Sequence, residues 1–174
     1  MIVYFNGNFI AHEDVKVLPF DRAFLFSDGV YEALRTYNGK LFRLGDHLKR
    51  LKFSLKELDI TFNDINLIEE ICSNLSDING IKRDYAVYLQ ISRGVSFPRT
   101  HHYEDNLTPN VFANVKPIKD NSKEINDGVK VIFEKDLRWL RCDIKSTSLL
   151  PAVLANQKAF KNSAYEAILY RDDF

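Results

Sequence analysis

The sequence has little that would indicate metal, disulfide or polyanion chemistry. Its two cysteines, Cys72 and Cys142, lie far apart and show no Cys-x-x-Cys or Cys/His ligand spacing, so neither a disulfide framework nor a zinc site is predicted. The 24 basic and 24 acidic residues cancel, which removes any general electrostatic reason to expect nucleic acid or an anionic membrane as a partner. We therefore expect no metal, no nucleic acid and two reduced thiols.

Long hydrophobic runs and targeting segments are also missing. No apolar run approaches the length needed to span a bilayer, and the first residues, 1–7, lack the basic region and apolar core of a signal peptide. Internal repeats and low-complexity segments are absent as well. A chain of 174 residues can form one good-sized domain or two small ones. We expect a globular protein of the cytoplasm that does not contact a membrane.

Two Asn-Gly pairs, 6–7 and 38–39, predict the tight turns of two β-hairpins, because these residues accept positive φ angles. The return strand of the second hairpin is expected over 40–44. The strand before it alternates, so Tyr31 and Glu32 are expected to point to opposite faces of the sheet.

From residue 45 the apolar period becomes helical, with a leucine seam that predicts an amphipathic helix over 45–58. His47 and Arg50 lie one turn apart on this helix. Asn63 or Asp64 can cap a second amphipathic helix that ends near residue 79. Further strands are expected over 84–91, 111–115, 129–134 and 165–170, with a last helix over 149–162.

The segment 117–127 is polar and lacks apolar periodicity, which is typical of a connecting loop between domains. We expect a complete N-terminal α/β domain over 1–116 and the start of a C-terminal domain over 128–174. The last strand stops beside Arg171 with no following element to complete a layer. The predicted fold is therefore α+β, with two domains of which the second is incomplete.

One lysine, Lys145, lies between an apolar strand pattern and the start of an apolar helix, with Ile144 and Ser146 beside it. A lysine amine at the edge of a core is the nucleophile that Schiff-base chemistry needs. Most lysines beside apolar runs are solvated surface residues, however. The surrounding sequence must decide between these interpretations.

That surrounding sequence, RWLRCDIKS at 138–146, closely resembles the lysine region of D-amino-acid aminotransferases, which are fold-type IV pyridoxal-phosphate enzymes. The resemblance extends from the first hairpin to 165–169. It implies a homodimeric transferase that moves an amino group between a D-amino acid, such as D-alanine, and a 2-oxo acid. Lys145 would first hold pyridoxal phosphate as an imine and then act as the base that moves a proton.

The same resemblance implies how the cofactor is held. The pattern at 26–32 includes Tyr31, which would line the cofactor and substrate pocket. Arg50 matches an arginine aimed at the cofactor phosphate, a task that suits the forked donors of a guanidinium. His47 and Glu166 match positions that join this arginine in a polar network.

The segment 93–101 resembles the loop from which D-specific members present an arginine and a histidine to the substrate α-carboxylate. It assigns Arg99 and His101 to substrate binding, with His102 as the neighbouring histidine. The loop is one residue longer than the family pattern, and Phe97 is the expected insertion. The family usually works as a dimer, with a substrate loop contributed by the partner subunit.

Other functions stay open. Branched-chain L-amino-acid aminotransferase and aminodeoxychorismate lyase belong to the same family, and the loop with Arg99 and His101 separates them from the D-specific enzymes. The third alternative is a catalytically silent, truncated fragment that self-associates through exposed strands. Because the family continues beyond the region matched here, we expect the 174-residue chain alone to be inactive. We also expect it to bind pyridoxal phosphate weakly or not at all.

Overall fold

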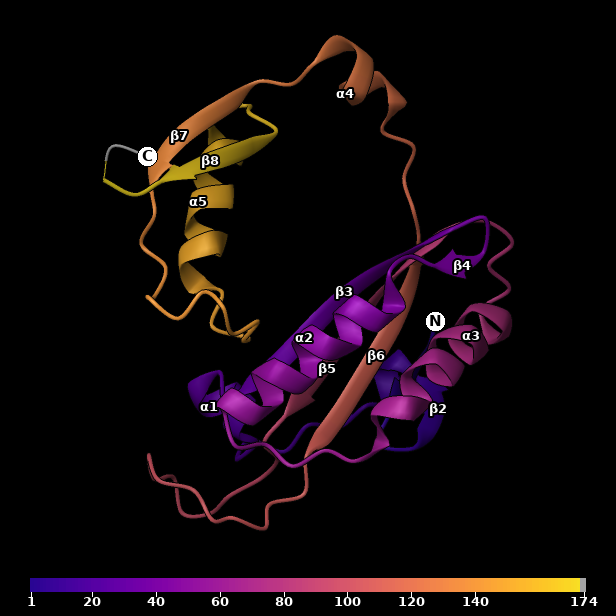
Figure 1. Ribbon diagram of the computed structural model, residues 1–174, viewed down its shortest axis with the longest axis vertical. Helices are drawn as coiled ribbons and strands as arrows, with labels where there is room; N and C mark the ends of the chain where they lie inside the picture. The colour runs from indigo at the N-terminus through magenta and orange to yellow at the C-terminus, as the bar shows by residue number, and fades with distance from the viewer. Residues whose placement is uncertain (173–174) are drawn as a thin grey trace. The chain divides into compact units, whose positions relative to one another are not determined.

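The computed structural model describes residues 1–172, which form two compact units (Figure 1). The first unit is Met1–Ile118 together with Asp143–Thr147, and the second contains Lys119–Cys142 and the chain from Ser148 onward. Each unit combines helices with its own sheet, so the α+β prediction is confirmed. Among the residues described, no helix combines the length and apolarity that a membrane span needs.

The first unit is built on a six-stranded sheet with the order β2-β1-β6-β5-β3-β4, in which every pair is antiparallel. Strand β3 pairs with β5 in a register that joins Gly29 to Ser92 and Arg35 to Ala86. The strands are β1 (Ile2–Phe5), β2 (Asn8–Ala11), β3 (Gly29–Tyr37), β4 (Lys40–Leu41), β5 (Tyr85–Ser92) and β6 (Asn110–Pro117).

Both predicted hairpins form, and their Asn-Gly turns have positive φ angles: 46° and 88° at Asn6 and Gly7, 51° and 74° at Asn38 and Gly39. The return strand β4 is shorter than the expected 40–44. It ends because Arg43 adopts the left-handed conformation, with φ 52°, directly before the next helix. This leaves the edge of β3 at its Gly29 end without a β4 partner.

Helices α2 (Leu44–Glu57) and α3 (Ile68–Ile78) cover one face of this sheet (Figure 1). Their apolar faces bury Leu51, Leu55, Ile71 and Leu75 against the inward side chains of the strands. The predicted cap at Asn63 or Asp64 is wrong. A 3₁₀ turn, Asp64–Leu67, comes first and α3 begins after Leu67, with no side-chain hydrogen bond at either start.

Two short elements precede β3 that the apolar pattern did not predict. They are the 3₁₀ turn His12–Asp14 and helix α1 (Arg22–Phe26). Helix α1 begins because the Asp21 carboxylate accepts a hydrogen bond from the Ala23 backbone N–H at 2.8 Å. An element this short has too few positions to reveal a period.

The second unit contains a parallel pair of strands, β7 (Val131–Lys135) and β8 (Glu166–Tyr170), joined by helix α5 (Leu150–Lys161). The expected loop 117–127 contains the end of β6 and helix α4 (Ser122–Asp127), so it is not wholly irregular. The division between the units after Ile118 lies within this segment. Residues 143–147 belong to the first unit, although the sequence placed them in the second domain.

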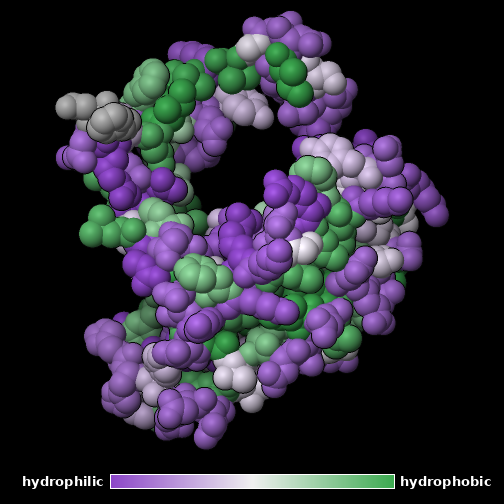
Figure 2. All heavy atoms as spheres, in the orientation of Figure 1, coloured by the Kyte–Doolittle hydropathy of each residue, from purple (hydrophilic) through white to green (hydrophobic). Residues whose placement is uncertain are grey.

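The second unit leaves much of its apolar surface exposed, and Figure 2 shows hydrophobic atoms at the surface where Figure 1 draws β7. Ala159 of α5 is buried, whereas other apolar side chains are not. Exposed fractions include 68% for Phe133, 70% for Leu137, 86% for Leu140, 60% for Leu154 and 75% for Phe160. The described part of this unit therefore has only a small core of its own.

The core of the first unit gives a direct test of the fold. Leu75 of α3 is 0% exposed, so we expect Leu75→Ala to lower the free energy of unfolding by about 2–5 kcal/mol through lost burial and a cavity. Urea denaturation followed by circular dichroism measures this. Leu67, which is 45% exposed, provides the matched control, and an equal loss in Leu67→Ala would contradict the packing described.

Candidate active site

The segment Asp143–Thr147 reaches the first unit by pairing with the free edge of β3. The Tyr31 N–H donates to the Lys145 carbonyl at 3.0 Å, and the Thr147 N–H donates to the Gly29 carbonyl at 3.0 Å. The Lys145 N–H donates in turn to Ser54 Oγ of α2 at 3.1 Å. These bonds fix the backbone of the segment between a strand and a helix.

The backbone turns tightly at Lys145, because the Ser146 N–H donates to the Ile144 carbonyl at 2.9 Å. Ile144 and Ser146 on either side are 4% and 6% exposed, whereas Lys145 is only partly buried. Its Nζ lies 4.1 Å from the centroid of the Tyr31 ring, which stacks on Tyr88 with the centroids 5.6 Å apart. The predicted pocket residue Tyr31 thus contacts the predicted cofactor lysine directly, and the aromatic face attracts its ammonium.

The other face of β3 carries a buried carboxylate, Glu32, which is 1% exposed. Arg50 of α2 donates to it through two nitrogens, Nε to Oε1 and Nη2 to Oε2, both at 2.7 Å. His47 Nδ1 lies 2.8 Å from Oε2. Because an ionised carboxylate only accepts, Nδ1 carries the proton, and the 3.4 Å approach of Arg50 Nη2 to the same nitrogen is a contact between two donors.

This network keeps Glu32 ionised. Burial opposes its charge, but hydrogen bonds from Arg50 and His47 outweigh that cost, and the pKa of Glu32 lies below its ordinary value. The Glu32 hydrogen bond likewise raises the pKa of Arg50. The Arg50 side chain stays 45% exposed and has five N–H donors in all. It can therefore bind a second acceptor, such as a phosphate oxygen, while Glu32 holds it.

The loop between β5 and β6 carries Arg99 and His101, and both side chains lie against Phe26 of α1. The Arg99 Cζ is 4.4 Å from the Phe26 centroid, and the His101 ring centroid is 5.5 Å from it. Phe97 packs edge-to-face on Phe20 at 4.9 Å. Phe97, the expected insertion, thus packs on Phe20 and not on Phe26, which contacts Arg99 and His101.

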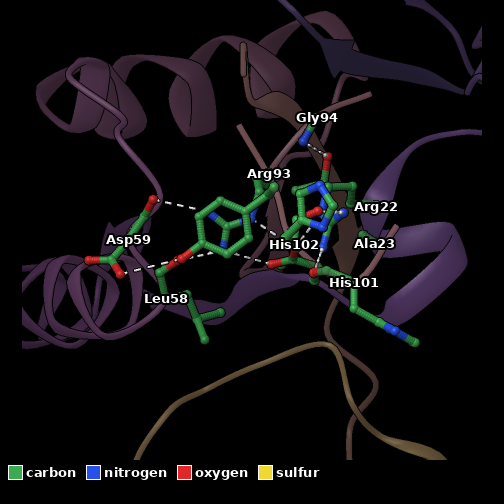
Figure 3. A network of polar contacts seen from close by, with 12 residues as sticks. Arg22, Ala23, Leu58, Asp59, Arg93, Gly94, His101 and His102 are labelled. Carbon is green, nitrogen blue, oxygen red and sulfur yellow. Dashed lines mark hydrogen bonds and ion pairs between the residues drawn. The ribbon is translucent and has the colours of Figure 1, made fainter. Parts of the chain in front are cut away.

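The base of this loop is fixed by buried polar contacts, drawn in Figure 3. Arg22 and Arg93 are 4% and 5% exposed, and the Nε atoms of both donate to Asp28 Oδ2 at 2.8 Å. Gly94 has a φ of 106°, and a side chain there would collide with the Thr108 carbonyl. The loop therefore leaves β5 along a defined path.

Glu166 is the exposed first residue of β8 in the second unit, where it pairs with Val131. Its predicted place in the network of Arg50 stays a prediction. Within residues 1–172, no cluster of His, Cys, Asp and Glu has the makings of a metal site.

Three residues of this site were not predicted from the sequence. Glu32 could have been found, because a carboxylate on the inward face of an otherwise apolar strand needs charged partners when buried. Arg22 and Phe26 gave no comparable signal. They lie on the short helix α1 and contact a loop more than 70 residues further along the chain.

Comparisons with known proteins identify the family of this chain. The model of the amino-transferase class IV family matches residues 29–173. The chain belongs to the class IV aminotransferase family. The D-alanine aminotransferase of Bacillus licheniformis is 46% identical over 174 residues, which cover 99% of this chain and 60% of that protein. For the D-alanine aminotransferase of Staphylococcus aureus strain N315 the identity is 37%, with coverage of 98% and 61%.

Solved class IV aminotransferase structures share the fold of this chain. The Escherichia coli branched-chain amino acid aminotransferase has a TM-score of 0.84 at 18% identity, covering 99% of this chain and 60% of that one. A pyridoxal-phosphate-bound form of a hypothetical Mycobacterium tuberculosis aminotransferase has a TM-score of 0.80 at 20% identity, covering 99% and 63%. The chain thus spans about three fifths of the length of these relatives.

The Glu32 network predicts a specific dependence of stability on pH. Because the pKa of Glu32 is lowered on folding, its contribution is present above the unfolded carboxyl pKa of about 4.3 and is lost as the pH falls through the folded pKa. We expect Glu32→Gln to lower the free energy of unfolding at pH 7 by about 1–2 kcal/mol, allowing for screening at half-exposed Arg50.

The difference in unfolding free energy between Glu32→Gln and the unmodified protein should shrink towards pH 3, as measured by urea denaturation over a pH series. Glu70→Gln, at an exposed position of α3, is the control. A constant difference at every pH would contradict an ionised Glu32.

Proposed function

We propose that this sequence forms the lysine-bearing and carboxylate-binding part of a pyridoxal-phosphate-dependent aminotransferase that acts on D-amino acids, such as D-alanine, and 2-oxo acids. The observation that carries the proposal is the Lys145 amine, fixed 4.1 Å from the Tyr31 ring by a backbone paired to β3. The 46% identity to a D-alanine aminotransferase supports the substrate class.

The residues present fit pyridoxal phosphate. A half-buried lysine amine suits its aldehyde, and a partly exposed guanidinium suits its phosphate. Pyridoxal phosphate supplies an electron sink that stabilises negative charge at the substrate Cα. Lys145 would hold the cofactor through Nζ, and the same atom would accept and release the proton of the substrate Cα. Tyr31 would keep that nitrogen from swinging into solvent.

Arg50 would bind the phosphate, and Glu32 would hold its guanidinium at a fixed angle. The paired charges of Glu32 and Arg50 sum to about zero. Binding of the phosphate would therefore depend more on the direction of the Arg50 N–H donors than on net electrostatic attraction. His47 adds a second hydrogen bond to Glu32 and would prevent the carboxylate from rotating. Glu166 is proposed as a further partner of Arg50, on the resemblance alone.

Arg99 and His101 would bind the α-carboxylate of the substrate. Arg99 supplies a permanently charged guanidinium donor, and His101 supplies an imidazole N–H donor. Fixing the carboxylate sets the direction in which the Cα hydrogen points towards Lys145, and hence the preference for one enantiomer. The shared contact with Phe26 favours His101 over His102 as the partner of Arg99.

We also propose a homodimer in the cytoplasm, in which the partner subunit contributes a substrate loop, as the resemblance implies. The free thiols of Cys72 and Cys142 are compatible with a reducing compartment. Branched-chain aminotransferases share the fold at 18–23% identity, which carries no information about substrate. The loop with Arg99 and His101 supports the D-specific alternative.

Lys145 is the first residue to test. With millimolar pyridoxal phosphate and borohydride, we expect a stable phosphopyridoxyl group on Lys145 Nζ, found by peptide mapping, because this amine alone is fixed in the proposed site. Lys145→Ala should lose the label. Lys130→Ala, which removes a lysine bonded to the Asn162 carbonyl in the second unit, should keep it. A label spread over many lysines would contradict the assignment.

Arg99 tests the substrate class, in a protein that carries this sequence at the length of its relatives. We expect Arg99→Ala to raise the KM for D-alanine by about tenfold or more, the effect of losing a charged hydrogen bond, with cofactor affinity unchanged. Arg35→Ala, which removes another arginine stacked on an aromatic ring, should leave the KM unchanged. Equal turnover of L- and D-alanine before mutation would refute the D-specific proposal.

A further inference from the structure

Two buried arginines share one carboxylate at the base of the loop, which is more cationic charge than Asp28 can balance. Arg93 forms a bidentate ion pair with Asp28, with Nε donating to Oδ2 at 2.8 Å and Nη2 to Oδ1 at 3.0 Å. Arg22 contributes its Nε to the same Oδ2 at 2.8 Å. A buried guanidinium is costly unless its other donors are also satisfied. The partners of those other donors show what each arginine holds in place.

Arg22 uses its remaining nitrogens on the backbone of the loop (Figure 3). Nη1 donates to the Thr100 carbonyl at 2.9 Å and approaches the His102 carbonyl at 3.3 Å, and Nη2 donates to the His101 carbonyl at 3.0 Å. Its backbone N–H donates to the Gly94 carbonyl at 2.8 Å. A single residue therefore holds the start of the loop and the three residues that follow Arg99.

Arg93 is directed elsewhere, which makes it a useful comparison. Its guanidinium donates to the carbonyls of Leu58 and Asp59, at the end of α2. It also stacks on Tyr103 of the loop, with Cζ 3.5 Å from the ring centroid, and the Arg22 Cζ lies 5.6 Å from the same ring. The two arginines thus differ in their carbonyl partners: those of Arg93 lie at the end of a helix, whereas those of Arg22 lie around Arg99 and His101.

Helix α1 also supports the side chains of the loop. Phe26 lies one turn after Arg22. Its ring contacts Arg22 at 4.8 Å, Arg99 at 4.4 Å and His101 at 5.5 Å, measured to its centroid. The separation between the Arg99 and His101 donors is therefore set by one rigid ring and by the carbonyls on either side of His101.

We propose that Arg22 and Phe26 are positioning residues that make the loop a carboxylate site: Arg22 fixes its backbone and Phe26 orients Arg99 and His101. This inference rests on the proposed function, in which the loop binds the substrate α-carboxylate. Neither residue needs to touch the substrate. Their effect is to hold two exposed donors in one arrangement, so that binding does not have to order them.

The test measures carboxylate binding by the chain itself, without cofactor. The probe is propionate, titrated while the Arg99 Nε–H is followed by nuclear magnetic resonance, with propionamide as the uncharged control. We expect Arg22→Lys to weaken propionate binding by about tenfold, because one ammonium cannot span Asp28 and three carbonyls. Phe26→Leu should also weaken propionate binding. If Arg22→Lys fails to fold, the propionate affinity of Phe26→Leu tests the positioning role.

Arg93→Lys is the matched control, because it loses a bidentate guanidinium contact with the same carboxylate, Asp28, but leaves the loop carbonyls bound to Arg22. We expect it to lower the melting temperature about as much as Arg22→Lys does, while propionate affinity changes less than about threefold. Equal weakening by both lysine variants would overturn the inference. Unchanged affinity in both Arg22→Lys and Phe26→Leu would overturn it too.

Arg99→Ala separates this inference from the proposed function. If Arg99→Ala binds propionate as well as the unmodified chain, the loop is not a carboxylate site and the substrate assignment fails. If Arg99→Ala loses binding while the Arg22 and Phe26 variants keep it, the substrate assignment stands and only the positioning role is refuted.

Discussion

The candidate active site depends on a short stretch of backbone pairing at the edge of β3. Strand β4 covers only the Tyr37 end of that edge, and Asp143–Thr147 pairs with the Gly29 end. The pairing is a single bridge between Val30 and Ser146, and the chain turns at Lys145 through a hydrogen bond from the Ser146 N–H to the Ile144 carbonyl. Ile144 and Ser146 are buried on either side of this turn, and the Lys145 amine lies over the Tyr31 ring. The main chain therefore brings the candidate nucleophile to Tyr31, and the aromatic contact holds its side chain there.

Two carboxylates, one in β3 and one directly before it, hold the arginines of the site in the same way. Glu32 binds Arg50 of α2 and also His47, and Asp28 binds Arg22 of α1 and Arg93 after β5. A buried carboxylate without partners would be strongly destabilising, so folding itself ties each of these arginines to its carboxylate. In both cases one arginine keeps donors for a second task. Arg50 stays half exposed, and Arg22 reaches the loop carbonyls.

Elements with a long apolar period were predicted well from sequence, including α2, α3, β3 and β5, because burial imposes their pattern. Short elements such as α1 and α4 were missed, since five or six residues cannot display a period. The cap of α3 was wrong because a 3₁₀ turn replaced it. Among site residues, the resemblance indicated Lys145, Arg50, Arg99 and His101, and the structure adds the partners that hold them. The place of Glu166 relative to Arg50 stays a prediction.

The supporting residues of the loop escaped sequence analysis for a physical reason. Arg22 recognises the loop through carbonyl groups, at sequence separations of 78 to 80 residues. Every amino acid supplies a carbonyl, so the loop sequence carries no trace of this contact. A loop held through its carbonyls can exchange side chains without losing its path. Helix α1 thus fixes the backbone of the loop whatever side chains the loop carries. Substitutions at Arg99 or His101 can therefore alter what is bound, while the donors of Arg22 keep the backbone in place.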